Sequence, residues 1–193
     1  ISTGDLAPDG VEVMSFRSNV PEIAKFTFRR FDPEYHEKAK EMAPGFIVGG
    51  HNYGQGSSRE HAALAPLHLG IRAVIAKSFA RIHRRNLVSQ GILPLRFKDE
   101  EDYEKLEEGQ KLELPDLRRH LENGDEEVPA RMDGTEITLL AEYSQREREI
   151  LLNGGVLRQL RQEAAPSAVA RAEPQEAEAK DAGTYPSPEV PRG

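Results

Sequence analysis

Short apolar runs separated by helical stretches constrain the fold of this chain most strongly. Residues 46–48 form a compact apolar run before two glycines, and residues 73–76 form the next such run after a predicted helix. A third unit follows, with a helix over residues 80–90 and a strand over residues 92–95. Strands that alternate with helices are typical of β–α–β units. Pro94, which has no backbone N–H, predicts an edge or a bulge for the third strand.

The pattern changes after Gly109. Apolar residues recur at 112 and 114, at 128–132 and at 137–140, and the pair Asp133-Gly134 is a hairpin signal between the last two runs. Ser144, with Glu147 three residues later, predicts a capping box at the start of a final helix. We therefore expect antiparallel strands followed by one helix.

The two ends of the chain differ from this centre. Residues 1–30 carry scattered prolines and glycines, which predicts a loop-rich entry with at most short strands. Asp32 and Pro33 then predict the start of a helix over residues 34–42. Residues 163–193 contain no Leu, Ile or Phe and are rich in Ala, Glu and Pro, so we expect a disordered tail. The predicted folded domain covers residues 1–162 and is of the α/β class.

Charge and composition exclude several classes of protein. The formal net charge is −7, so no basic surface for nucleic acid is expected. No apolar run approaches the ~20 residues of a membrane span, and no signal peptide opens the chain. These features favour a cytoplasmic location. The sequence has no cysteine, so it supplies no disulfide, no thiolate nucleophile and no cysteine ligand for zinc or an iron–sulfur cluster.

The segment over residues 52–61 carries the chemistry. Gly54 and Gly56 predict a tight turn, and we expect a helix to begin at Ser57 and Ser58. Such a helix start attracts anions, and the guanidinium of Arg59 can bind a carboxylate through two hydrogen bonds. A small polycarboxylate would suit this site.

A purely structural reading of the same residues is open, because Ser57 and Glu60 have the spacing of a capping box. The glycine spacing matches neither the phosphate-binding loop with its lysine nor the dinucleotide fingerprint. His61 and His83 lie in helical patterns without a third ligand at metal-binding spacing, which favours structural roles. The cluster of Arg81, Arg84 and Arg85 indicates a solvated face, with contact to another domain as the alternative.

Several segments together resemble the swivel domain of the aconitase family. They are residues 52–66, 77–83 with Asn86 and Leu87, and 91–95. Tyr53 and Gln55 resemble aconitases more than the small subunit of isopropylmalate dehydratase, which usually has phenylalanine and cysteine there. Residues 1–3 and 17–21 are similar to the opening active-site loop of the family. Because that loop is cut at Ile1, we expect the natural polypeptide to extend upstream.

The resemblance implies a three-layer β/β/α swivel domain with a mixed, partly closed sheet. It implies that Ser57 is the base that removes a carbon-bound proton, that Arg17 and Arg59 bind substrate carboxylates, and that Ser58 adds a hydrogen bond. The family usually has Asp directly after the threonine, whereas this chain has Gly4. We expect Asp5 to take over that catalytic role.

The implied activity is the reversible dehydration of citrate to isocitrate through cis-aconitate. The implied cofactor is a [4Fe–4S] cluster bound by other domains, in cis or on a large subunit, so this chain alone is expected to be inactive. Expected partners are those domains and the tricarboxylate substrate, with no nucleic acid and no membrane. Two alternatives stay open: the small subunit of isopropylmalate dehydratase or homoaconitase, and a lone swivel domain without catalysis.

Overall fold

The computed structural model describes residues 1–169, apart from residues 11, 12, 14 and 17. Arg17, predicted to bind a carboxylate, and most of the predicted tail therefore lie outside the described residues. Among the residues described, no helix is both long enough and apolar enough to cross a bilayer.

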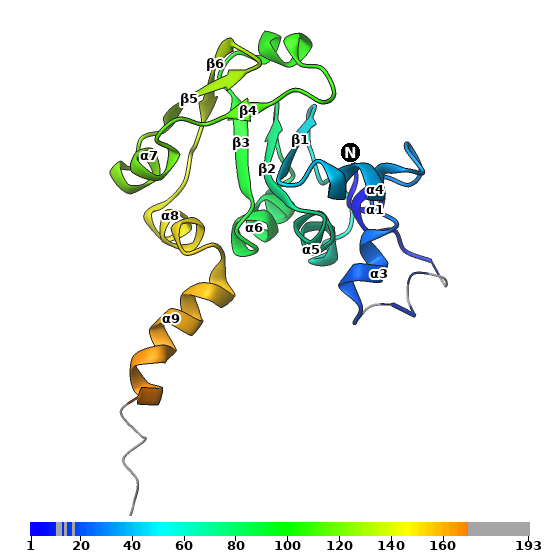
Figure 1. The fold of residues 1–193 in the computed structure, drawn as a ribbon, viewed down its shortest axis with the longest axis horizontal. Helices are drawn as coiled ribbons and strands as arrows, with labels where there is room; N and C mark the ends of the chain where they lie inside the picture. Colours follow the sequence, from blue (N-terminus) through cyan, green and yellow to red (C-terminus); the bar gives the residue numbers. More distant parts are fainter. Residues whose placement is uncertain (11–12, 14, 17, 170–193) are drawn as a thin grey trace, which may run out of the picture.

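A six-stranded mixed sheet forms the centre of the fold, with the strand order β1-β2-β3-β6-β5-β4 (Figure 1). Strands β1 (Gly45–Gly49), β2 (Ile71–Ala76) and β3 (Leu93–Phe97) are parallel neighbours. Strands β4 (Leu112–Glu113), β5 (Glu127–Met132) and β6 (Thr135–Leu140) continue the sheet with antiparallel pairings. The predicted β–α–β rhythm and the predicted antiparallel strands are both confirmed.

Helices connect and cover these strands. The connections of the parallel half carry α5 (His61–His68) and α6 (Arg81–Ser89). The entry forms α1 (Thr3–Leu6), α3 (Val20–Ala24) and α4 (Tyr35–Glu41). After β3 come the 3-10 helix η1 (Glu100–Lys105), α7 (Leu117–Asn123), α8 (Gln145–Leu152) and α9 (Val156–Val169). In Figure 1, α9 projects away from the sheet.

The parallel half of the sheet is buried on both faces. On β2, Val74 packs into a core cluster with residues of α1, α3 and α5, whereas the next residue, Ile75, packs into a second cluster with β5, β6 and α7. Alternate residues of a strand point to opposite faces, so the two clusters lie on opposite sides of β2. Burial on both faces is the usual condition of parallel strands.

The sheet is curled. Val48 of β1 packs against the same cluster as Leu112 of β4, although these strands stand at opposite ends of the strand order. A flat sheet would keep its two edge strands far apart, because neighbouring strands are about 4.8 Å apart. Because both edge strands pack against one cluster, the antiparallel half folds back toward the parallel half. This curl confirms the expected mixed, partly closed sheet.

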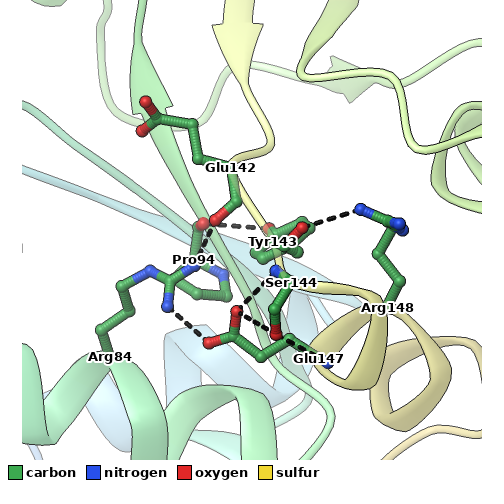
Figure 2. A network of polar contacts seen from close by, with 7 residues as sticks. All are labelled: Arg84, Pro94, Glu142, Tyr143, Ser144, Glu147 and Arg148. Atoms are coloured by element: carbon green, nitrogen blue, oxygen red, sulfur yellow. Dashed lines mark hydrogen bonds and ion pairs between the residues drawn. The ribbon is translucent and has the colours of Figure 1, made fainter.

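A polar network fixes α8 against α6 and β3 (Figure 2). Ser144 and Glu147 form the predicted capping box at the start of α8. Arg84 of α6 donates to the Glu147 carboxylate at 2.6 Å. The buried hydroxyl of Tyr143 donates to the carbonyl oxygen of Pro94 at 2.9 Å. These contacts join helices and strands that are far apart in the sequence.

Pro94 lies on the inner strand β3, so its expected place at an edge or a bulge is wrong. The β3–β6 ladder starts only at Arg96, and Pro94 faces that side with its carbonyl bonded to Tyr143. The N–H and C=O of one strand residue point to the same side of the strand. The missing N–H of Pro94 therefore interrupts no bond to β2.

Other expectations about the elements need correction. The described part of residues 1–30 contains the short helices α1 and α3 where short strands had been expected, because Ser2 and Asp5 form a capping box and Asn19 caps α3. Helix α7 follows β4 without having been predicted. Helix α9 continues through Val169, so residues 163–169, expected to belong to the tail, are helical.

Candidate functional site

The candidate site is built on the loop that follows β1. Gly54 and Gly56 have φ values of +80° and +105°, in the region that favours glycine. A Cβ on Gly54 would lie 2.1 Å from the ring of His83, so no larger residue fits there. The backbone N–H of Tyr53 donates to Ser78 at 2.9 Å, and that of Thr3 donates to Gln55 at 2.8 Å. The loop is thus held between the chain start and the segment after β2.

Ser57 lies exposed on this loop. Its backbone carbonyl accepts a hydrogen bond from Thr3 Oγ1 at 2.8 Å. Within the described part of the chain, its own hydroxyl has no hydrogen-bond partner. The backbone is therefore fixed while the hydroxyl is available to a ligand.

A cavity of about 280 Å³ brings together the three predicted residues Ser57, Ser58 and Arg59. Thr3, Gly54, Gly56 and the start of α6 complete its wall. It lies where the loops after the parallel strands β1 and β2 meet, which is the usual position of ligand sites in open α/β sheets. The glycine turn and the predicted residues thus lie together in one concave part of the surface.

The helix does not begin at the serines, as had been expected. Helix α5 starts at His61, with Glu60 as its N-cap and no side-chain capping bond. Ser57 and Glu60 consequently form no capping box, and the structural reading of their spacing is wrong. The turn of Gly54 and Gly56 is tied down on both sides, which delays the first helical residue. The N–H groups of Ser57 and Ser58 are accordingly not at a helix start.

Arg59 is held by the segment that follows α1. Its Nη1 donates to the carbonyl oxygen of Ala7 at 2.8 Å, and its Nη2 donates to the carboxylate of Asp9. The Arg59 side chain is 19% exposed, whereas that of Asp9 is 63% exposed. A second cavity, of about 260 Å³, lies on the Asp9 side and also touches Ser58 and Arg59.

Asp5, the predicted substitute for a missing acid, does not line the serine cavity. Its carboxylate accepts hydrogen bonds from the backbone N–H and the hydroxyl of Ser2, at 2.8 and 2.7 Å, and lies 4.0 Å from Arg30. Burial raises the pKa of Asp5, but the Ser2 hydrogen bonds and the Arg30 charge outweigh it and lower the pKa overall. Asp5 therefore caps α1, and the structure does not bring it to Ser57.

Position 4 is next to the site. A Cβ on Gly4 would lie 3.5 Å from Ser2 Oγ and 3.6 Å from Arg59 Nη1. A side chain at this position would therefore point toward the arginine. Because residue 4 is a glycine, α1 places no carboxylate beside Arg59 from this position.

His83 forms a buried wall of the serine cavity. It is 2% exposed, and neither of its ring nitrogens has a hydrogen-bond partner among the residues described. Burial lowers the pKa of His83 to about 4, so the imidazole is neutral near pH 7. The ring of Tyr53 lies 5.6 Å away, and burial raises the pKa of that phenol. No sequence signal had separated this histidine from an ordinary helical one.

The remaining polar candidates have other positions. Over the described ranges, no group of three or more His, Cys, Asp or Glu residues is arranged to hold a metal ion. Arg84 is bound to Glu147 and to the carbonyl oxygen of Glu142. Arg81 and Arg85 are exposed on α6, and Arg81 lines the serine cavity.

A larger cavity, of about 730 Å³, lies between η1 and the β5–β6 hairpin. Its charged residues include Lys98 and Arg131, which form ion pairs with Glu127 and Glu136. It contains none of the predicted site residues. Size alone does not define a site. We assign the site to the cavity of about 280 Å³, because Arg59 and the unbonded hydroxyl of Ser57 converge there.

Comparison with known proteins identifies the same segment. The model of the aconitase C-terminal domain matches residues 18–100. The mitochondrial aconitate hydratase of Gracilaria gracilis is 44% identical over 106 residues, which is 54% of this chain and 14% of that protein. The mitochondrial homocitrate dehydratase of Saccharomyces cerevisiae is 53% identical over 74 residues, which is 38% of this chain and 9% of that protein. The chain thus spans a small part of the length of these relatives.

A solved structure matches more of the chain. It is the 3-isopropylmalate dehydratase structure from Methanocaldococcus jannaschii, with a TM-score of 0.67 and 28% identity. The match covers 88% of this chain and 91% of that one. The likeness therefore includes the antiparallel half of the sheet as well as the matched segment.

The expected cytoplasmic location is contradicted by these comparisons. The relatives from Gracilaria gracilis and Saccharomyces cerevisiae are both named as mitochondrial proteins, as is a probable aconitate hydratase of Caenorhabditis elegans that is 63% identical over 60 residues. The matched residues 18–100, the curled sheet and the glycine loop agree, and together they support a swivel domain like that of the aconitase family.

Proposed function

We propose that this chain is the swivel-domain part of an aconitate hydratase, which interconverts citrate and isocitrate through cis-aconitate. The single observation that carries the proposal is that Ser57, Ser58 and Arg59 line one cavity on a fixed glycine turn. The aconitate hydratases among the relatives support the substrate class.

In this proposal Ser57 removes the carbon-bound proton. A serine hydroxyl is a weak base in water, so its deprotonated form needs nearby cations or N–H donors. The unbonded hydroxyl of Ser57 is free to face a substrate, and Arg59 adds a positive charge to the same cavity. Ser58 and Arg59 bind substrate carboxylates, and Arg17, outside the described residues, is proposed to bind another.

Asp5 has less support as a catalytic group than the two serines. Its carboxylate is engaged with Ser2 and lies outside the cavity wall. We therefore assign Asp5 to the support of α1, which positions Thr3. Through its bond to the Ser57 carbonyl, Thr3 connects α1 to the serine loop.

The residues of this chain do not fit an iron–sulfur cluster, because the sequence has no cysteine thiolate. We propose that the [4Fe–4S] cluster is held by other domains, either on the same polypeptide or on a large subunit. This chain would then have no hydro-lyase activity by itself. Its contribution is to bind carboxylates and to move a proton.

A second candidate function is supported by one observation. The match covers 91% of the chain in the isopropylmalate dehydratase structure. In that protein, a domain of this size is therefore a separate chain. This favours a small subunit that acts on isopropylmalate or, as the homocitrate dehydratase relative suggests, on homocitrate. A lone swivel domain without catalysis is the third alternative.

Reconstitution tests these alternatives. The chain, combined with cluster-loaded aconitase domains, is assayed for cis-aconitate formation from citrate and for dehydration of isopropylmalate and homocitrate. We expect turnover of citrate with the combined protein and none with either part alone. Turnover of isopropylmalate or homocitrate alone would support the second candidate, and inactivity with all three substrates would support the third.

A further inference from the structure

The guanidinium of Arg59 already holds a carboxylate from its own chain. Nη2 donates to Asp9, and Nη1 donates to the carbonyl oxygen of Ala7, two residues earlier in the same segment. The Arg59 side chain is mostly shielded, whereas Asp9 lies at the rim with 63% of its side chain exposed. Because Asp9 lies at the rim, another carboxylate can approach Arg59 from solvent and take its place.

The carboxylate at Arg59 does not come from α1. Gly4 has no side chain, although a Cβ there would lie 3.6 Å from Nη1. Asp5 is turned toward Ser2 and Arg30. Among the residues that the structure describes, Asp9 is the acid that pairs with Arg59.

Arg59 forms part of the wall between two cavities. The one of about 280 Å³ contains Ser57, and the one of about 260 Å³ contains Asp9. Ser58 and Arg59 line both. A ligand carboxylate that enters beside Ser57 therefore meets an arginine whose Nη1 and Nη2 each already donate one hydrogen bond to the Ala7–Asp9 segment, with Asp9 balancing its charge.

We propose that Asp9 is an internal competitor for Arg59, which a ligand carboxylate must displace, so that Asp9 sets the affinity of the site. This inference rests on the proposed function, because it takes Arg59 as the binder of a substrate carboxylate. Asp9 presents the same chemical group as such a ligand, and its attachment to the chain gives it a high effective concentration. The apparent affinity for the ligand is the intrinsic affinity multiplied by the fraction of molecules in which Asp9 does not occupy Arg59.

The size of the effect follows from the exposure of the pair. Exposed ion pairs are weak, because water and salt screen them. Removal of the competing charge should therefore tighten ligand binding by about threefold to fivefold, the upper part of what an exposed pair provides, because Arg59 is itself mostly shielded. The gain should shrink as the salt concentration rises.

The test measures binding of tricarballylate, a plain propane tricarboxylate, to the 193-residue chain by calorimetry. We expect Asp9→Asn to lower Kd by about threefold to fivefold. Glu60→Gln is the matched control: it removes one negative charge from the wall of the Asp9-side cavity, where Glu60 bonds to Gln90 at 2.9 Å. The control should change Kd less than Asp9→Asn does.

A double variant separates displacement from a general charge effect. In an Arg59→Gln background, Asp9→Asn should not lower Kd for tricarballylate, because the guanidinium for which Asp9 and the ligand compete is no longer present. An equal gain in that background would overturn the proposal. So would an unchanged or weaker affinity of Asp9→Asn itself, since weaker binding would mean that Asp9 holds Arg59 in place for the ligand.

A measurement on the unmodified chain keeps the inference independent of how the variants fold. In NMR titrations, tricarballylate should shift the side-chain carboxyl signal of Asp9 together with the amide signals of Ser57 and Ser58. Shifts at the serines without a shift at Asp9 would overturn this inference and leave the proposed function standing. Unchanged serine signals would count against the proposed function itself.

Discussion

The ring of His83 lies against the backbone of Gly54, in the space where a side chain at that position would be. A Cβ on Gly54 would approach His83 Cδ2 to 2.1 Å and Cγ to 2.2 Å. The residue also has a φ of +80°, which L side chains rarely adopt. Helix α6 thereby fixes the shape of the loop that carries Ser57.

Gly54→Ala should therefore destabilise the domain and disorganise the serine cavity. We expect a loss of roughly 2–4 kcal/mol in the free energy of unfolding, because steric overlap and backbone strain add. Gly50→Ala is the control, since a Cβ there would meet nothing within 4 Å. Urea unfolding of both variants measures the difference, and equal midpoints would contradict the packing described.

The neutral, buried His83 predicts a pH dependence of stability. Its pKa is about 4 in the folded protein against an ordinary value of 6.5, so the unfolded chain binds a proton in this window and the folded one does not. Stability should fall as the pH drops from about 6.5 to about 4, by at most about 3 kcal/mol from this group. Below that window the contribution no longer changes.

His83→Phe should remove this slope, because phenylalanine does not titrate. It also removes two buried nitrogens without partners, so the variant should be at least as stable as the parent near pH 7.5. Unfolding curves from pH 4 to 8 compare the two proteins. An identical slope in the variant would show that other groups cause the dependence.

Ser57→Ala should separate catalysis from stability. In the assembled enzyme we expect turnover to fall by roughly 10²–10⁴-fold with little change in substrate affinity, because a base acts on the proton in the transition state. Because Ser57 is exposed and caps no helix, the free energy of unfolding should change by less than about 0.5 kcal/mol. Near-normal turnover by folded, cluster-loaded protein would remove Ser57 from the mechanism.

Arg59→Lys should behave differently from the alanine variant of Ser57. Lysine keeps the positive charge but loses the planar guanidinium that binds a carboxylate through two donors. We expect weaker substrate binding together with slower turnover. Steady-state kinetics on the reconstituted enzyme show this as a higher KM and a lower kcat. A change in kcat alone would contradict a role for Arg59 in binding.

Tyr143→Phe tests the contact between β3 and the segment before α8. The variant loses the buried hydroxyl that donates to the Pro94 carbonyl at 2.9 Å and leaves that carbonyl unpaired (Figure 2). We expect a loss of about 1–3 kcal/mol in unfolding free energy. Tyr103→Phe, on η1, serves as a control because the Tyr103 ring contacts Phe97 and Lys77, while its hydroxyl makes no hydrogen bond to any residue that the structure describes. Equal effects would contradict the assignment.

The sequence predicted the strands well and the helix starts unevenly. Three places have a serine followed by an acid three residues later, at Ser2, Ser57 and Ser144. The first and third form capping boxes, but Ser57 does not, because the glycine turn before it is held by residues distant in sequence. The spacing of neighbouring residues does not show which distant residues hold this turn.

The site was predicted in the same uneven way. Ser57, Ser58 and Arg59 are neighbours in sequence, so their convergence needed no knowledge of the fold. The pairing of Arg59 with Asp9 joins residues 50 positions apart and has no local signal. The burial of His83 against Gly54 likewise depends on how α6 packs, which residue spacing does not specify.

The two halves of the sheet meet along a narrow seam. The ladder between β3 and β6 consists of Arg96 with Leu140 and Phe97 with Leu139. The family match at residues 18–100 ends before β4, on the side of this seam that carries the serine loop. Among the described residues, only these two residue pairs join the β4–β6 strands to β3 along the ladder, so a change within β4–β6 should disturb the serine loop less than a change in β1 or β2, whose following loops line the cavity.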